Sequence, residues 1–202
     1  MEATGGFWGA VTFLNRDEAQ TVDVLAGLII PGSQEDPGAQ EAGAVLYIDR
    51  ALAGPYRNLQ GLYRSGLAAL DKSCVERQGR RFVELDEGEQ TSVLEWLAAG
   101  GLDTAVAAER AESEDEDSSD IGFLPYFFAV VRQHVVEGTF GDPVYGGNRN
   151  AVGWRLVGFP GAHWGYGEDA MQYGFDASAL PVVTLQDLRN EREQRKGEPE
   201  RG

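Results

Sequence analysis

The sequence predicts a mainly α-helical fold, a compact multi-helix domain that ends in a long irregular segment rich in glycine, proline and aromatic residues. Apolar residues recur at three- to four-residue spacing in five stretches of the chain, whereas the alternation typical of strands is scarce. With 202 residues, 42% of them hydrophobic, the chain is long enough to bury one core. Cys74 is the single cysteine, so no internal disulfide can support that core.

The first two helices are expected in the first quarter of the chain. Asn15 is a suitable N-cap, and Glu18 stands at the third helical position, which is the capping-box arrangement. The apolar stripe of this helix consists of Ala19, Val22, Leu25, Leu28 and Ile29, and Pro31-Gly32 ends it. After a loop, a second helix is expected from about Gln40 to the breaking pair Gly54-Pro55. Its inward side chains are Ala42, Val45, Leu46, Ile48 and Leu52.

Three further helices follow the same spacing. The third is expected from about Tyr56 to Glu76. Asp86 and Glu89 form a second capping box and open the fourth helix, which Gly100-Gly101 closes. The fifth is expected from about Phe123 to Glu137, with an apolar stripe of Phe123, Phe127, Val130, Val131 and His134. Later in the chain, "PVVTL" is consistent with a short extended piece.

The composition divides the chain into one domain and two ends. Residues 13–183 are expected to form the helical domain, preceded by a flexible N-terminus at 1–12 and followed by a charged tail at 184–202, either an exposed helix or a frayed end. Residues 109–120 are acidic and rich in serine. Such a composition is typical of a solvated surface loop, and the segment lacks the ligand spacing of a calcium loop.

The charge excludes two classes of partner. The formal net charge is −16, so the surface repels phosphate backbones and anionic lipids, and we expect no nucleic-acid binding. No run of about 18 apolar residues exists, so no direct membrane insertion is expected. The first thirty residues lack a basic region followed by an apolar one, and the chain as it stands is therefore expected in the cytoplasm.

Residues suited to catalysis are few. His134 and Glu137 share a helical face, and His163 could complete a metal site. This set makes a small metal-dependent hydrolase one alternative function. Against it, His134 lies on an apolar stripe, where a hydrogen-bonded core histidine is commoner. We predict no catalytic, cofactor-binding or metal-binding residue in this chain, and interpret Cys74 as a small buried apolar residue.

Residues 137–161 hold seven glycines, two prolines and several aromatic residues. Glycine allows close backbone approach and proline fixes φ, so the segment specifies one loop path. A rigid aromatic loop that is poor in groups suited to acid–base chemistry suits the binding of a protein surface. The candidate partner-binding residues are Tyr145, Gly146, Gly147, Asn148, Trp154 and Pro160, with Glu41 and Tyr47 as weaker candidates. The alternative is that Trp154, Phe159 and the glycines pack the loop onto its own helices.

Three separated segments carry a family resemblance. The segments "LAGLIIPGSQEDPGAQEAGAVLYIDRAL" (25–52), "YRSGLAALD" (63–71) and "EGTFGDPVYGGNRNAVGWRLVGFPGA" (137–162) resemble motifs of the gluconate 2-dehydrogenase subunit 3 family and follow the same order along the chain. The resemblance covers most of residues 13–165. The acidic segment and the chain after about Met171 have no counterpart in it.

The resemblance implies a non-catalytic small subunit. Members of the family bind an FAD-containing catalytic subunit of the glucose–methanol–choline (GMC) oxidoreductase type, which acts on the CH–OH groups of sugars and related alcohols; in some complexes a cytochrome c subunit is added. The small subunit is thought to help the large one fold and to escort its export through a twin-arginine signal. No such signal precedes Phe13, so an extracytoplasmic location requires a signal that was removed or is supplied by the partner. The FAD is expected in the partner, with no cofactor in this chain. The remaining alternative is a free-standing helical structural protein.

Overall fold

The structure, a computed structural model, describes residues 11–100 and 119–197 and is mainly helical, as predicted. Within these ranges the α-helices are α1 (Arg16–Ile29), α2 (Ala39–Ala42), α3 (Ala44–Ala53), α4 (Gln60–Gln78), α5 (Glu87–Ala98), α7 (Ser119–Phe140), α8 (Val152–Leu156) and α9 (Leu185–Gly197). Short 3-10 turns join several of them. The only β-type pairing in the described ranges is a single parallel bridge between Gly161 and Val183.

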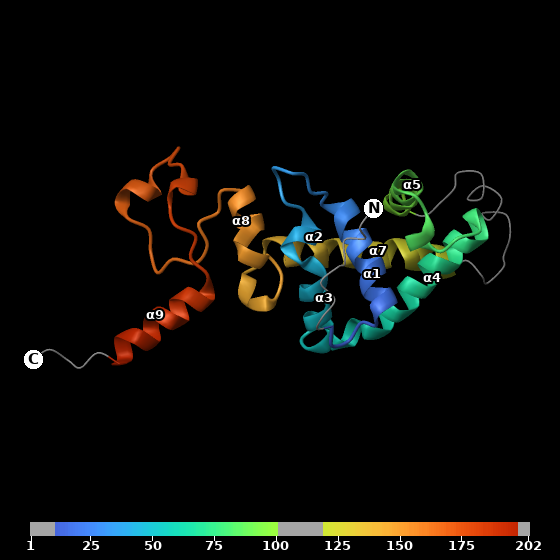
Figure 1. Ribbon diagram of the computed structural model, residues 1–202, viewed down its shortest axis with the longest axis horizontal. Helices are drawn as coiled ribbons and strands as arrows, with labels where there is room; N and C mark the ends of the chain where they lie inside the picture. The colour runs from blue at the N-terminus through green and yellow to red at the C-terminus, as the bar shows by residue number, and fades with distance from the viewer. Residues whose placement is uncertain (1–10, 101–118, 198–202) are drawn as a thin grey trace, which may run out of the picture.

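The helix α7 is the centre of the molecule. It packs against α1, α2, α3, α4, α5 and α8. Figure 1 shows it running along the long axis behind α1, α2 and α3. Because every large helix of the body contacts α7, its position determines where the segment that follows it begins.

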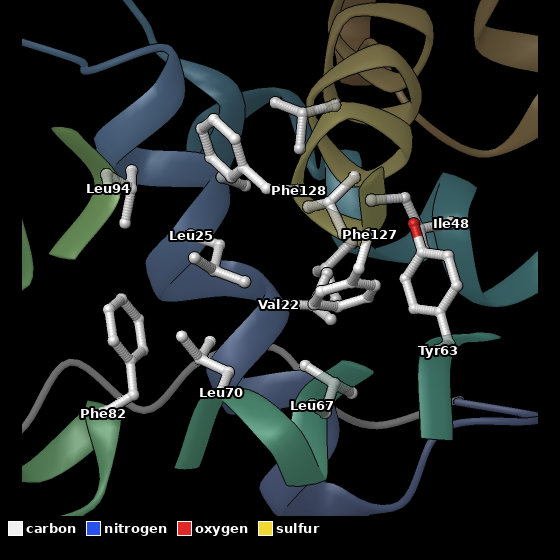
Figure 2. Close-up of a cluster of buried hydrophobic side chains, with 14 of the residues drawn as sticks. Val22, Leu25, Ile48, Tyr63, Leu67, Leu70, Phe82, Leu94, Phe127 and Phe128 are labelled. Atoms are coloured by element: carbon white, nitrogen blue, oxygen red, sulfur yellow. The ribbon is translucent and has the colours of Figure 1, made fainter. Parts of the chain in front are cut away.

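The core lies between α1, α4 and α7. Figure 2 shows the side chains of Val22, Leu25, Ile48, Tyr63, Leu67, Leu70, Phe82, Leu94, Phe127 and Phe128 in one cluster. The helices α4 and α7 approach closely at Gly66, where an added Cβ would lie 2.3 Å from the ring of Phe127. The core therefore requires a residue without a side chain at this crossing.

The predicted capping boxes are confirmed. At the start of α1, the backbone N–H of Glu18 donates to Asn15 Oδ1 at 3.0 Å and the N–H of Asn15 donates to Glu18 Oε2 at 2.9 Å. At the start of α5, Asp86 and Glu89 exchange the same pair of bonds, each at 2.9 Å. These bonds satisfy N–H groups that have no partner within the helix.

Buried Asp49 on α3 holds the segment before α1. Its carboxylate accepts backbone N–H bonds from Thr12 at 2.6 Å, Phe13 at 2.9 Å and Leu14 at 2.8 Å. A buried carboxylate needs such donors to offset its desolvation. The "YID" sequence of α3 therefore fixes where the chain enters the helical body.

The single helix expected from Gln40 to Leu52 is two helices. Gly43 adopts a left-handed conformation with φ 70°, which ends α2 and starts α3. The apolar spacing continues through this break, so the spacing alone does not reveal it. Two other bounds also differ: α4 begins at Gln60, after the 3-10 turn Arg57–Leu59, and α7 begins at Ser119 and continues to Phe140.

The ends of the chain are described only in part. Of the acidic segment predicted at 109–120, residues 109–118 lie outside the part of the chain that the structure describes. Its last two residues belong to α7. The N-terminus predicted at 1–12 lies outside them up to residue 10. The division of the chain at 13 and 183 stays a prediction. None of the helices in the described ranges combines the length and the apolar character that a bilayer crossing requires.

The chain after α8 contains few regular elements. Residues 157–184 form only the 3-10 turns Glu168–Met171 and Ala177–Ala179 before α9 begins. Val183, in the expected extended piece, pairs with Gly161. Figure 1 shows this segment and α9 at one end of the molecule, away from α4 and α5.

Candidate partner-binding surface

Asn148 fixes the path of the loop that follows α7. It has a left-handed backbone with φ 42° and is fully buried. Its backbone N–H donates to Gly138 O at 2.7 Å, its Nδ2 donates to Gly141 O at 2.8 Å, and its Oδ1 accepts from the N–H of Gly153 at 2.8 Å. Asparagine tolerates this backbone conformation better than other residues with a side chain. One residue thus joins the end of α7 to the start of α8.

The loop also lies directly on the backbone of α7. An added Cβ at Gly147 would be 2.1 Å from Gly138 O. No side chain can be inserted there without moving the loop away from the helix. The glycine pair at 146–147 therefore serves close contact within this chain.

Trp154 is turned inward. Its side chain is only 5% exposed, its Nε1 donates to Phe140 O at 2.6 Å, and its ring packs edge-to-face on Phe159 at 5.2 Å. It anchors α8 to the end of α7 and cannot reach a partner without leaving this position. These contacts are the ones expected in the alternative in which Trp154 packs the loop onto its own helices, and the assignment of Trp154 to a partner surface stays a prediction.

Three other candidates also face the interior of the chain. Gly147 and Pro160 are buried. Both polar atoms of the Asn148 side chain are used within the chain, so they are not available to a partner's backbone. These residues shape the loop, and their assignment to a partner surface stays a prediction.

The loop and α8 leave other apolar side chains in solvent. Tyr145 is 57% exposed and Val157 60% exposed, and Leu156 and Phe159 are also exposed. We call these four residues the loop surface. Of these four residues, only Tyr145 is among the partner-binding residues predicted from the sequence. The signal for the others is the apolar run "LVGF" (156–159), which begins at the last residue of the five-residue helix α8 and continues into the loop after it.

The weaker candidates are held by contacts within the chain. The exposed residue Glu41 accepts a bond from the N–H of Gly38 at 2.8 Å, which caps α2. The hydroxyl of Tyr47 donates to Glu137 Oε2 at 2.8 Å. Burial, with the neighbouring Glu137 carboxylate, raises the pKa of Tyr47 above its ordinary value. Both residues have structural roles here.

His134 is a core histidine, as its place on an apolar stripe suggests. It is buried between the rings of Tyr56 and Tyr63, whose centroids lie 4.6 and 5.9 Å from its own. Its Nδ1 forms a hydrogen bond with the Tyr63 hydroxyl at 2.9 Å. Burial lowers the pKa of His134 despite the opposing effect of Glu137. The imidazole is therefore neutral near pH 7.

The metal-site alternative lacks its ligand set. The Glu137 carboxylate accepts bonds from Tyr47, Tyr56 and Gln133. His163 bonds the carbonyls of Pro160 and Pro181 through Nε2. Within residues 11–100 and 119–197, no group of three His, Cys, Asp or Glu side chains could hold a metal ion. The structure does not bring His134, Glu137 and His163 together as that alternative requires.

Cys74 is an unreactive thiol in this structure. It is buried on α4. Burial raises its pKa to about 11, with a smaller contribution from Asp71. Because the thiolate is the reactive form, this thiol is a poor nucleophile near pH 7.

Comparison with protein families identifies the family of this chain. The family described as gluconate 2-dehydrogenase subunit 3 matches residues 16–161, which is most of the chain. The chain belongs to this family. The description of the gluconate 2-dehydrogenase subunit 3 family names one subunit of a dehydrogenase complex. Comparisons with curated proteins and with solved structures gave no match.

The match to gluconate 2-dehydrogenase subunit 3 covers most of the helices described above. It begins at the first residue of α1 and ends at Gly161. The helical body, the Asn148 loop and the loop surface lie inside it. The segment 162–197 lies beyond it.

Proposed function

We propose that this chain is a non-catalytic small subunit that binds the catalytic subunit of a sugar or alcohol dehydrogenase, helps it to fold and stabilises it. Membership of the gluconate 2-dehydrogenase subunit 3 family supports a place in a dehydrogenase complex. The proposed partner is the FAD-containing GMC-type subunit. The flavin and the reacting groups would belong to that partner, and a cytochrome c subunit is a further candidate acceptor of electrons.

The observation that carries this proposal is the combination of a fixed loop with an exposed apolar surface. Asn148, Trp154 and the backbone of α7 hold the loop in one position. The loop surface is nonetheless left in solvent. A surface that is ordered before binding loses little conformational entropy on association, so its apolar contacts contribute to affinity.

The helical body supports the same interpretation. Its most buried ionisable side chains serve packing: Asp49 holds the segment before α1, and His134 lies between two tyrosine rings. Neither is directed into a cleft with an activated nucleophile beside it. Such an arrangement suits a scaffold that supports the reaction of a neighbour.

Co-expression tests this proposal. The catalytic dehydrogenase subunit of the same organism is produced with and without this chain, and soluble yield and bound flavin are measured by absorbance. We expect soluble, flavin-loaded catalytic subunit only, or mainly, when this chain is present, because exposed apolar surface of an unpaired subunit leads to aggregation.

Two results would contradict the proposed function. If the catalytic subunit is soluble, fully loaded with flavin and equally active alone, the stabilising role is wrong and the chain is better described as a free-standing helical protein. If the isolated chain turns over a sugar unaided, the non-catalytic assignment is wrong.

A further inference from the structure

The segment after Gly161 forms a loop that is closed at its base, beyond α8. The N–H of Ala162 donates to Val183 O at 2.7 Å, and the N–H of Val183 donates to Pro160 O at 2.9 Å. Residues 162 and 183 are therefore neighbours in space although the chain between them is long. We call residues 162–182 the terminal loop.

The terminal loop has apolar side chains but no core. None of its residues is buried. Trp164 is 71% exposed, Met171 76% exposed, and Tyr173 fully exposed, and Tyr166 and Phe175 are also exposed. A folded monomer rarely leaves so many large apolar side chains in solvent within one short segment, and such a concentration marks an interaction surface.

We propose that the terminal loop is a second docking element, which grips the catalytic dehydrogenase subunit at an apolar surface rimmed by arginine and lysine. This inference rests on the proposed function. It extends it, because the terminal loop lies beyond the range that matches the family. The partner contact would thus include a part specific to this chain.

The area of the terminal loop is sufficient for such a contact. A large aromatic side chain buries roughly 150–250 Å². At the exposures given above, the five apolar side chains offer about 650 Å² to a partner. A stable protein–protein interface needs about 800 Å² from each side. The terminal loop and the adjacent loop surface together reach this value.

The charge of the terminal loop specifies the chemistry of the partner. Residues 162–182 contain Glu168, Asp169 and Asp176 but no lysine or arginine. A second copy of this chain, with a net charge of −16, would be repelled by them. A partner with basic residues around an apolar surface would be attracted, and electrostatic complementarity of this kind accelerates association.

The adjacency of residues 162 and 183 permits a clean excision. In the test variant, residues 164–181 are replaced by a short Gly-Ser linker, which leaves the backbone bonds of the bridge in place. The dissociation constant for purified catalytic subunit is measured by biolayer interferometry. We expect at least tenfold weaker binding, with unchanged helix content and thermal midpoint, because the terminal loop contributes nothing to the core.

A pair of substitutions tests the same surface without a deletion. Trp164→Ser with Tyr173→Ser is expected to weaken binding at least tenfold. The matched control, Tyr126→Ser with Val75→Ser, replaces two exposed apolar side chains of α7 and α4 and is expected to change binding less than twofold.

Each other result has a definite meaning. Unchanged affinity after excision, or an equal loss in the control pair, overturns the inference and leaves the proposed function standing. Self-association of the full chain that disappears on excision also overturns it, because the occupant is then a second copy. If the full chain fails to bind the catalytic subunit at all, the proposed function fails, and the inference fails with it.

Discussion

The buried polar side chains of this protein hold the backbone and the core in place; they do not position groups for a reaction. Asn148 joins the end of α7 to α8, and Asp49 holds the segment before α1. His134 fills the space between Tyr56 and Tyr63. Because each of these polar groups is buried and has hydrogen-bond partners, removing one leaves another group without a partner, which costs more than the bond itself is worth.

Two substitutions at Asn148 separate the effect of its side-chain hydrogen bonds from the effect of its left-handed backbone. Asn148→Gly keeps access to the left-handed backbone and loses both side-chain bonds, whereas Asn148→Ala loses both bonds and also strains the backbone. We expect Asn148→Gly to reduce the free energy of unfolding by about 2 kcal/mol and Asn148→Ala by roughly 1 kcal/mol more. Urea unfolding followed by circular dichroism measures both. Equal stability of the wild type and both variants would contradict the role given to Asn148.

The buried His134 should make the free energy of unfolding decrease as the pH falls below 6.5. Burial lowers its folded-state pKa below the ordinary value of 6.5. As the pH falls below 6.5, the unfolded chain therefore takes up a proton that the folded chain does not, and stability falls until the lowered pKa is reached. The slope from this one group is at most about 1.4 kcal/mol per pH unit.

The variant His134→Asn provides the comparison for this prediction. The asparagine amide can replace Nδ1 toward Tyr63 but does not titrate. We expect a lower stability overall and a shallower loss of stability between pH 6.5 and 5 than in the wild type, measured by thermal unfolding across that range. A slope identical to that of the wild type would show that His134 does not contribute.

At the scale of elements, the close crossing of α4 and α7 depends on one glycine. The ring of Phe127 occupies the space that a Cβ of Gly66 would need. The crossing brings Tyr63 of the same helix into contact with His134 of α7. Packing and the buried hydrogen bond therefore depend on the same interhelical distance.

Two glycines of α4 make a matched pair for testing this crossing. Gly66→Ala is expected to destabilise the protein by about 3 kcal/mol, because overpacking displaces Phe127 or the whole helix. Gly61→Ala lies in the same helix with open space around it, and we expect a gain of about 0.5–1 kcal/mol from the higher helix propensity of alanine. Thermal and urea unfolding of both variants give the comparison. A neutral Gly66→Ala would mean that the two helices can separate at little cost.

Most elements could be predicted from the sequence because their causes are local. Asn15–Glu18 and Asp86–Glu89 carry their capping partners within three residues. The break at Gly43 was missed because the apolar spacing runs through it, and only the sign of φ distinguishes a helical glycine from a terminating one. The early start of α7 at Ser119 was missed because its first residues are polar and acidic, a composition also typical of loops.

For the whole molecule, the candidate surface was only partly predictable. The sequence identifies 137–161 as a special loop, but it does not say which face of the loop is turned to solvent. Tryptophan is common both in cores and in interfaces, and here Trp154 is buried while Leu156 and Val157 are exposed. That division depends on the contact of Trp154 with Phe140 at the end of α7. Phe140 is 14 residues earlier in the chain, and its position is set by the packing of the whole helical body.

The arrangement of the whole molecule separates stability from binding. Figure 1 places α1–α5 along α7, with α8, the terminal loop and α9 at one end. Among the described residues, the large buried side chains lie in the helical body, whereas most of the exposed large apolar side chains lie between Tyr145 and Phe175. Substitutions of the exposed apolar side chains at that end should therefore affect association with a partner and leave folding nearly unchanged, in contrast to substitutions of buried Asn148 or Trp154.

A single charged residue at Val157 tests whether binding can be weakened without a change in stability. Val157→Asp places a carboxylate on the loop surface, where desolvation on binding would cost several times the energy of the lost apolar contact. We expect association with the catalytic subunit to weaken by about 1.4–2.8 kcal/mol, or roughly ten- to a hundredfold, with the thermal midpoint of the free chain unchanged. Val75→Asp adds the same charge at a similarly exposed position of α4 and controls for the extra negative charge. Isothermal titration of both variants decides the matter: an equal effect at the two positions would show that net charge, and not the loop surface, governs association.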